Sequence, residues 1–461
     1  MSNQAIASYL PDFQLIKLGL DLPAFCDPDD PRGFLGPHEI SYFFHEWLHY
    51  LHNASTIHGL SAFANLVHLW TLFRSSIGSD GLSRGSSALG ELDNVHLKQK
   101  IAFSEATRAS RRNFLASSVV LSAVEVTKVD FVDLPLPELT LTTRIISCGL
   151  QIRNAGGDYY SAQIQIGPHE IVESVAYMLE ERLTRKFGAE PRKIEFSPYF
   201  LLKALASYVS PNLSDDCVIA CGLASLQASN PPTDLLDILK RAESEQLSKG
   251  NVLDFLISTQ SKILRDAKEW IDERLDEING VFCADEPMAR AVRKTVETLR
   301  RNFEARRTDP FFELSLVDRI ASNYLDLTAI LQEFGACGLL QQRPGYEDDV
   351  ERDLIYEFVL DSDDNSELNE GRRIMHAAFR FVGLHSGDDG SLQATSQIAE
   401  TRKNMCPFYN VCSLDARKMH PENCAEKPWL WAAPSTANLC WYAQGVRKAS
   451  PPNIAAKLAE A

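Results

Sequence analysis

The chain has 461 residues, of which 45% are hydrophobic, and its 62 acidic and 46 basic side chains give a net charge of -16. This length and apolar content are sufficient for two or three domains with buried cores. The acidic balance argues against nucleic acid or an anionic membrane as the main partner, because both favour a basic surface. With no apolar run of membrane-spanning length and no secretory signal pattern at the start, we expect a cytoplasmic protein.

The N-terminal part of the sequence predicts a strand followed by two helices. Residues 13–20 alternate as a strand does, and Gly36 followed by Pro37 is typical of a helix start. A second helix is predicted at residues 56–75 from its apolar stripe. Ser55 is the expected cap of this second helix, since its hydroxyl can accept a hydrogen bond from a free N–H group.

The first of these helices contains the sequence His-Glu-Trp-Leu-His at residues 45–49, which is an HExxH motif. Residues four apart lie on the same face of a helix, so His45 and His49 can bind one divalent ion. Glu46 lies beside the first ligand and suits a general base that takes a proton from a metal-bound water. The flanking residues are uncharged and mostly bulky, as expected for a helix that is buried on most sides.

Further along the chain, residues 117–166 are rich in β-branched residues and predict three or more strands. Gly-Pro-His-Glu-Ile at 167–171 then has the same five residues that begin the first helix at 36–40. We interpret this likeness as shared helix-start chemistry and not as an internal repeat. The helix that follows is predicted to end near Gly188.

The remaining sequence to about residue 385 is predicted to be mostly helical, and its stripes of Leu, Ile and Phe are core positions. Helices are expected at 197–208, 214–228, 233–246, 251–279, 286–305, 314–334 and 346–360. These patterns together predict a predominantly helical α+β fold. We expect a catalytic region with a small sheet at 1–190, a helical region at 191–395 and a cysteine-rich module at 396–461.

Two histidines leave a catalytic zinc site one protein ligand short, because such sites usually have three. A metzincin would have glycine at position 52 and histidine at position 55, whereas this chain has His52 and Ser55. No glutamate lies between Glu46 and Glu91, which excludes a glutamate ligand on the next helix. Glu173, on the apolar helix after the strands, is the best remaining carboxylate. The alternatives are His58, His68 and His96.

With these residues the chain resembles the HExxH zincins, and more narrowly the gluzincins, in which a glutamate from a separate helix completes the site. The resemblance covers residues 45–49 and, loosely, the helix of Glu173. It implies a zincin-like catalytic region with a sheet whose edge strand pairs with an extended substrate. It also implies a zinc-dependent peptidase that hydrolyses a protein or peptide, with His45, His49 and Glu173 as zinc ligands and Glu46 as general base.

Three other polar residues are candidates for roles near the motif. His52 lies one turn beyond His49 and is interpreted as a hydrogen-bonded structural histidine, with a contact to the ion or substrate as the alternative. His169 and Tyr177 are candidate stabilisers of a tetrahedral oxyanion. Their sequence positions alone do not distinguish these roles.

A second candidate metal site lies in the last part of the chain, where four of the ten cysteines gather. Thiolates bind zinc or iron–sulfur clusters, and either would stabilise a segment too short to form much core. The spacing lacks a CxxC pair, so zinc is favoured only somewhat over an iron–sulfur cluster, and free buried thiols are the alternative. The four residues are Cys406, Cys412, Cys424 and Cys440.

Two other functional classes are compatible with the sequence. One is a catalytically inactive, metal-stabilised regulatory protein whose helical region binds a protein partner. The presence of Glu46 favours an active enzyme, because a vestigial site has little reason to keep this carboxylate. The other is a redox or nucleic-acid module built on a C-terminal iron–sulfur site.

Overall fold

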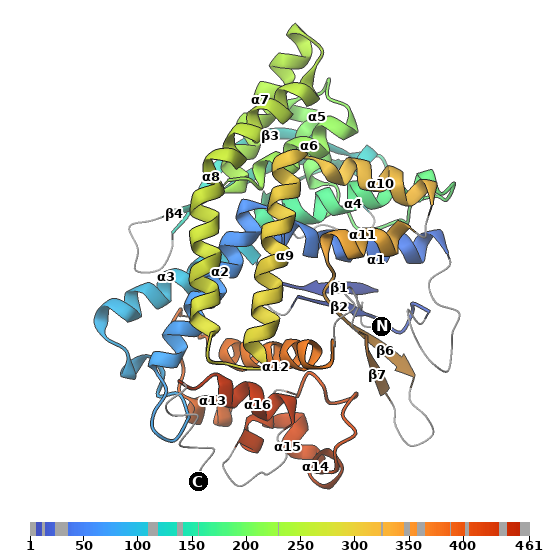
Figure 1. Ribbon diagram of the computed structural model, residues 1–461. Helices are drawn as coiled ribbons and strands as arrows, with labels where there is room; N and C mark the ends of the chain where they lie inside the picture. Colours follow the sequence, from blue (N-terminus) through green and yellow to red (C-terminus); the bar gives the residue numbers. More distant parts are fainter. Residues whose placement is uncertain are drawn as a thin grey trace.

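Two helices that pack against each other form the centre of the fold (Figure 1). Helix α1 spans Pro37–Asn53 and helix α4 spans Pro168–Lys186. Every residue of α1 from Phe43 to His52 is buried, which agrees with the uncharged flanks of the HExxH motif. The computed structural model describes residues 6–11, 14–23, 36–108, 119–135, 142–154, 156–228, 230–323, 326–344, 351–356, 365–387, 389–401, 405–432 and 440–451.

The two central helices begin with the same local chemistry, as their shared five-residue sequence predicts. Each starts at a proline, which has no N–H group to leave unpaired in the first turn. The Glu39 carboxylate accepts a hydrogen bond from Gly36 N–H at 2.9 Å, and Glu170 accepts one from Gly167 N–H at 2.8 Å. These bonds satisfy a free backbone donor at each helix start, so the likeness needs no internal repeat.

Two small sheets accompany these helices. In the first, β1 is antiparallel to β2, β2 is parallel to β6, and β6 is antiparallel to β7. The second is an antiparallel meander of β3, β4 and β5. The strands are β1 (Ala7–Leu10), β2 (Leu15–Leu18), β3 (Val124–Pro135), β4 (Thr142–Arg153), β5 (Tyr159–Ile166), β6 (Gly338–Pro344) and β7 (Glu351–Tyr356).

Helices supply most of the rest of the described chain, and the long pair α8 and α9 packs side by side (Figure 1). None of the described helices combines the length and apolar character needed to cross a bilayer. The remaining α-helices are α2 (Ile57–Ser75), α3 (Glu91–Arg108), α5 (Leu201–Val209), α6 (Asp215–Ser225), α7 (Pro231–Ser248), α8 (Val252–Phe282), α9 (Met288–Thr308), α10 (Phe312–Ser322), α11 (Asp326–Phe334), α12 (Asn365–Leu384), α13 (Thr395–Thr401), α14 (Asp415–Met419), α15 (Pro421–Glu426) and α16 (Trp441–Lys448). Short 3-10 helices are η1 (Gly85–Ala88), η2 (Leu121–Ala123) and η3 (Pro428–Ala432).

The α+β class and the predominance of helix agree with the sequence prediction, whereas a zincin-like fold stays a prediction. Three local predictions are wrong. The single helix predicted at 314–334 is divided into α10 and α11, because Asn323 has an extended backbone. The helix predicted at 346–360 is strand β7 where the structure describes it, because this segment pairs with β6. The cap of α2 is Thr56, whose hydroxyl accepts from Gly59 N–H at 3.1 Å, while the Ser55 hydroxyl donates to the Leu51 carbonyl.

The HExxH helix is fixed to the loop after α11 through Trp47. Its buried indole N–H donates a hydrogen bond to the Gly335 carbonyl at 3.0 Å. Gly335 has a φ of +89°, and a Cβ atom at this position would lie 2.6 Å from the Tyr50 hydroxyl. Only glycine fits this close approach, so the loop is held directly against α1.

A buried ion pair joins the end of α1 to α9 and α10. The Arg306 guanidinium pairs with the Glu313 carboxylate, and both side chains are fully buried. Arg306 also donates hydrogen bonds to the Ser55 hydroxyl at 2.8 Å and to the Pro310 carbonyl at 2.8 Å. These contacts satisfy the charges inside the protein and fix the position at which α1 ends.

Replacing Arg306 with methionine is expected to lower the free energy of unfolding by about 3–5 kcal/mol, because the Glu313 carboxylate would stay buried without its partner. The double variant Arg306→Met/Glu313→Leu removes both charges and should be more stable than the single variant. Arg300→Met removes a partly exposed ion pair on the same helix and should lower the free energy of unfolding by about 1 kcal/mol or less. Urea denaturation measures all three, and a double variant less stable than Arg306→Met would contradict the argument.

Candidate metal centre

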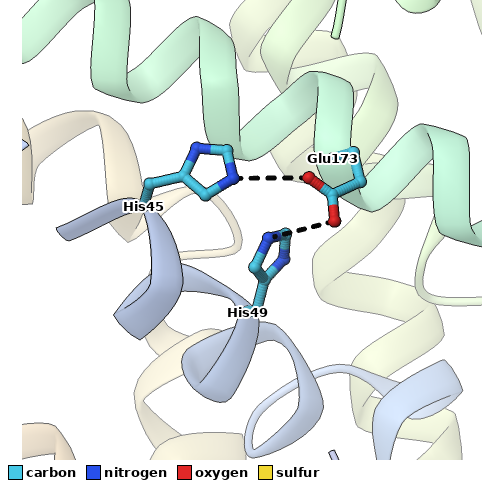
Figure 2. A group of neighbouring side chains, drawn as sticks. All are labelled: His45, His49 and Glu173. Carbon is cyan, nitrogen blue, oxygen red and sulfur yellow. Dashed lines mark hydrogen bonds and ion pairs between the residues drawn. The ribbon is translucent and has the colours of Figure 1, made fainter. Parts of the chain in front are cut away.

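His45 and His49 extend from one face of α1 toward Glu173 on α4 (Figure 2). His45 Nε2 lies 3.3 Å from Glu173 Oε2, and His49 Nε2 lies 3.4 Å from Glu173 Oε1. Among the residues that the structure describes, these three are the group whose possible ligand atoms all lie within 4.8 Å of one another. The four-residue helical spacing and the packing of α1 on α4 therefore bring two imidazoles and one carboxylate to a single point.

A second carboxylate holds the other side of the His45 ring. His45 Nδ1 lies 2.8 Å from Glu180 Oε2, and Arg192 Nε lies 3.2 Å from the other oxygen of this carboxylate. Glu180 is thus oriented by Arg192 and directs the Nε2 edge of His45 toward Glu173. A carboxylate behind a histidine is the arrangement that fixes ring orientation and raises ligand basicity in metal sites.

The charges of these side chains fit a buried cation. Burial by itself lowers the pKa of His45, but the Glu173 and Glu180 carboxylates outweigh it and raise this pKa to about 10. Burial would raise the pKa of Glu173, yet the charges and hydrogen bonds of His49 and His45 hold it well below its usual range. The group therefore favours a positive charge between its donor atoms. Two imidazoles and a carboxylate are also a donor set that suits zinc.

A cavity of about 340 Å³ opens onto this group. His49, Glu173 and Glu46 line it together with Ala7, Ser8 and Tyr9 of β1. Burial raises the pKa of Glu46, and the nearby His45 and His49 oppose this rise. A carboxylate with a raised pKa is suited to accepting a proton and then returning it.

Two side chains that complete the site were not predicted from the sequence. Tyr199 lines the cavity with its ring 6.1 Å from that of His45, and burial together with the Glu173 charge raises its pKa. Its hydroxyl therefore stays protonated and can donate a hydrogen bond. Glu180 carried a usable signal, because it lies two turns after Glu173 on the same helix face. Tyr199 carried none, since it precedes α5 in an irregular segment.

The three other predicted polar residues lie in different environments. His52 is buried with Nε2 3.5 Å from Glu313 Oε1, and burial together with the Arg306 charge keeps its pKa well below the usual range. His169 lines the cavity, with Nε2 4.0 Å from Glu173 Oε1. The Tyr177 hydroxyl donates to the Arg192 carbonyl at 3.3 Å, and this residue is not among the described residues that line the cavity.

The alternatives to Glu173 as third ligand lie elsewhere. His58 lines the cavity but does not belong to the group of close donor atoms. His68 lies beside Arg274, whose guanidinium is 3.3 Å from the imidazole, and His96 is exposed on α3. Of the four candidates, Glu173 is the one that the structure brings to His45 and His49.

The cysteines of the second predicted site gather in another place. All four line a separate cavity of about 430 Å³ in the C-terminal part of the chain. They are free thiols, and none of them lines the cavity next to the HExxH motif. The four are Cys406, Cys412, Cys424 and Cys440.

Glu180→Gln is expected to weaken zinc binding about 10- to 100-fold, because the amide keeps the shape of the side chain but loses the charge that supports His45. Glu181→Gln is the matched control, since this neighbouring carboxylate pairs with Arg185 at 2.8 Å and belongs neither to the group of donor atoms nor to the described cavity lining. Its zinc affinity should equal that of the wild type. Competition with a coloured chelator measures the three affinities, and equal values for all would show that Glu180 has no such role.

Acid is expected to destabilise the protein through His58. Burial lowers the pKa of this histidine from 6.5 to about 4, and its Nδ1 atom has no hydrogen-bond partner among the described residues. The unfolded chain binds this proton more tightly than the folded chain does. The free energy of unfolding is therefore highest above pH 6.5, and it decreases as the pH drops toward 4. Between pH 8 and pH 5, the free energy of unfolding of His58→Gln should therefore decrease by about 2 kcal/mol less than that of the wild type.

The acid effect is measured by urea denaturation of chelator-treated protein at the two pH values. His420→Gln is the control, because the imidazole of His420 is largely exposed and its replacement should leave the pH-dependent loss unchanged. The same loss in the wild type and in His58→Gln would exclude His58 as a source of acid sensitivity.

No protein-family model, curated protein or solved structure matches this chain. The resemblance of residues 45–49 to the zincins therefore stays a prediction. The case for a metal centre rests on the geometry and charges of the side chains on α1 and α4.

Proposed function

We propose that the protein is a zinc-dependent peptidase that hydrolyses a protein or peptide substrate. The observation that carries this proposal is the composition of one cavity. His49, Glu173 and Glu46 line it beside an edge strand, and His45 completes the group of donor atoms. A metal site with a carboxylate next to it and with room for a chain segment is what peptide hydrolysis requires.

His45, His49 and Glu173 are the residues that hold the zinc ion in this proposal. Zinc, when bound there, supplies a Lewis acid that lowers the pKa of a water molecule and polarises a carbonyl group. Glu46 accepts the proton of the attacking water and delivers it to the leaving amine. The Tyr199 hydroxyl lines the same cavity and donates a hydrogen bond to the oxygen that gains negative charge.

The strand beside the cavity suggests how a substrate lies there. Among the described strands, β1 has a neighbour on one side only, which is β2. Gly19 N–H donates to the Ile6 carbonyl at 2.8 Å, so the alternation of antiparallel bonds turns the backbone groups of Ala7 away from β2. An extended peptide can pair with these groups, so we expect unfolded or extended segments as substrates.

Glu46→Gln is the variant that tests this proposal. It should bind zinc as the wild type does and hydrolyse peptides at least about 100-fold more slowly, because the amide cannot accept the proton. His45→Ala should lose both zinc and hydrolysis. Glu181→Gln, a carboxylate change on α4 outside the group of donor atoms, should retain both. Zinc content is measured by atomic emission, and cleavage of a peptide library by mass spectrometry.

Two results would contradict the proposal. One is zinc-loaded Glu46→Gln that cleaves a confirmed peptide at the wild-type rate, which would remove Glu46 from the reaction. The other is zinc-loaded wild type that cleaves no member of the library or of a panel of unfolded proteins. The second result would favour a metal-stabilised regulatory protein.

A further inference from the structure

The four C-terminal cysteines come from different short elements and converge on one space. Cys406 and Cys412 flank a turn, Cys424 lies on α15, and Cys440 is the N-cap of α16. All four line the cavity of about 430 Å³. Cys406 N–H donates to the Cys424 carbonyl at 2.9 Å, which ties two of the cysteine segments together. The convergence is therefore built into the backbone of this region.

The spacing of the sulfur atoms separates the possible metals. A single zinc ion with four thiolates at about 2.3 Å holds its sulfur atoms about 3.8 Å apart. Within the described part of the chain, no three of these cysteines form a group whose ligand atoms lie within 4.8 Å of one another. A cubane iron–sulfur cluster keeps its cysteine sulfurs roughly 6 Å apart, because the metal core lies between them. The lack of a close three-cysteine group and the cavity of about 430 Å³ that all four cysteines line fit a cluster better than a single ion.

Hydrogen-bond donors are directed at two of the four sulfur atoms. Ala443 N–H donates to Cys440 Sγ at 3.4 Å, and the backbone of Phe408 donates to Cys406. Such N–H groups stabilise sulfur when it carries negative charge, as it does in a ligand to iron.

The cysteines lie in segments with little regular structure of their own. The helices beside the cysteines are short, since α15, which contains Cys424, has 6 residues and α16, which Cys440 caps, has 8. Segments of this length bury little apolar area, and a polynuclear centre would join them.

Aromatic side chains close the space around the sulfur atoms and connect it to the rest of the fold. Phe408 and Trp441 line the cavity and contact each other, with ring centroids 5.4 Å apart. Phe408 also packs on His376 of α12, and the Arg373 guanidinium of that helix lies 4.4 Å from the Trp441 ring. The C-terminal region therefore rests on α12, away from the HExxH helix (Figure 1).

From the convergence of the cysteines on one cavity, the lack of a close three-cysteine group and the N–H donors, we infer that Cys406, Cys412, Cys424 and Cys440 bind a [4Fe–4S] cluster. Each thiol gives its proton to solvent, and four sulfur–iron bonds form. In reconstitution, four ferric ions combine with four sulfide ions, and dithiothreitol supplies two electrons, so the core carries a charge of about +2. This site is independent of the proposed peptidase activity.

Anaerobic reconstitution of the full-length protein with ferric iron, sulfide and dithiothreitol tests the inference. We expect about four iron and four sulfide ions per chain, a broad visible absorption band and a Mössbauer spectrum typical of a cubane cluster. Cys406→Ser and Cys440→Ser should each lose most of this iron and absorption. Cys283→Ser is the matched control, because this exposed cysteine lies outside the cavity and its replacement should leave the cluster intact.

Circular dichroism shows whether each cysteine variant folds. If a variant does not fold, the iron and sulfide content of the wild type still decides the inference. One tightly bound zinc ion lost with Cys406→Ser, a two-iron cluster, or no bound iron and sulfide would each overturn it. Glu46→Gln should retain the full cluster. If that variant loses peptidase activity and keeps its cluster, the two sites act separately, and each proposal can fail without the other.

Discussion

The Glu173 carboxylate lies between two buried histidines, and this contact joins the two central helices. A carboxylate and two imidazoles in a protein interior are stable only if they satisfy one another or a bound cation. Glu180 and Arg192 extend the same principle outward, since each charge has an opposite charge beside it. The positions of α1 and α4 are therefore determined by polar contacts as well as by apolar packing. A centre held in this way is organised before any ligand arrives.

A different set of contacts fixes the middle and the C-terminal end of α1. Arg306 and Glu313 neutralise each other at the point where the helix ends, and Trp47 bonds to a glycine loop beside its middle. Both contacts involve residues between Arg306 and Gly335, and these residues thereby support the helix that carries His45 and His49. This region therefore helps to position the side chains of α1 in the site.

Part of the site could be predicted from the sequence because its residues obey local rules. His45, Glu46 and His49 follow from helical periodicity, and Glu173 follows from its place on an apolar helix. Tyr199 and β1 could not be predicted as parts of the cavity, because long-range packing alone brings them there. The same limit applies to β6 and β7, where a segment read as helix is strand because it pairs with the N-terminal sheet. The convergence of the four C-terminal cysteines on one cavity is also a tertiary property.

The parallel pairing of β2 with β6 has a consequence for how the protein is made. Leu15 in β2 lies opposite Gly338 in β6, so most of the chain must be synthesised before this pair can form. The strand β1 that borders the cavity depends on β2 for its position. A nascent chain therefore carries the HExxH helix long before it has a bordered cavity. The border of the cavity can therefore form only after the segment around Gly338 has been synthesised.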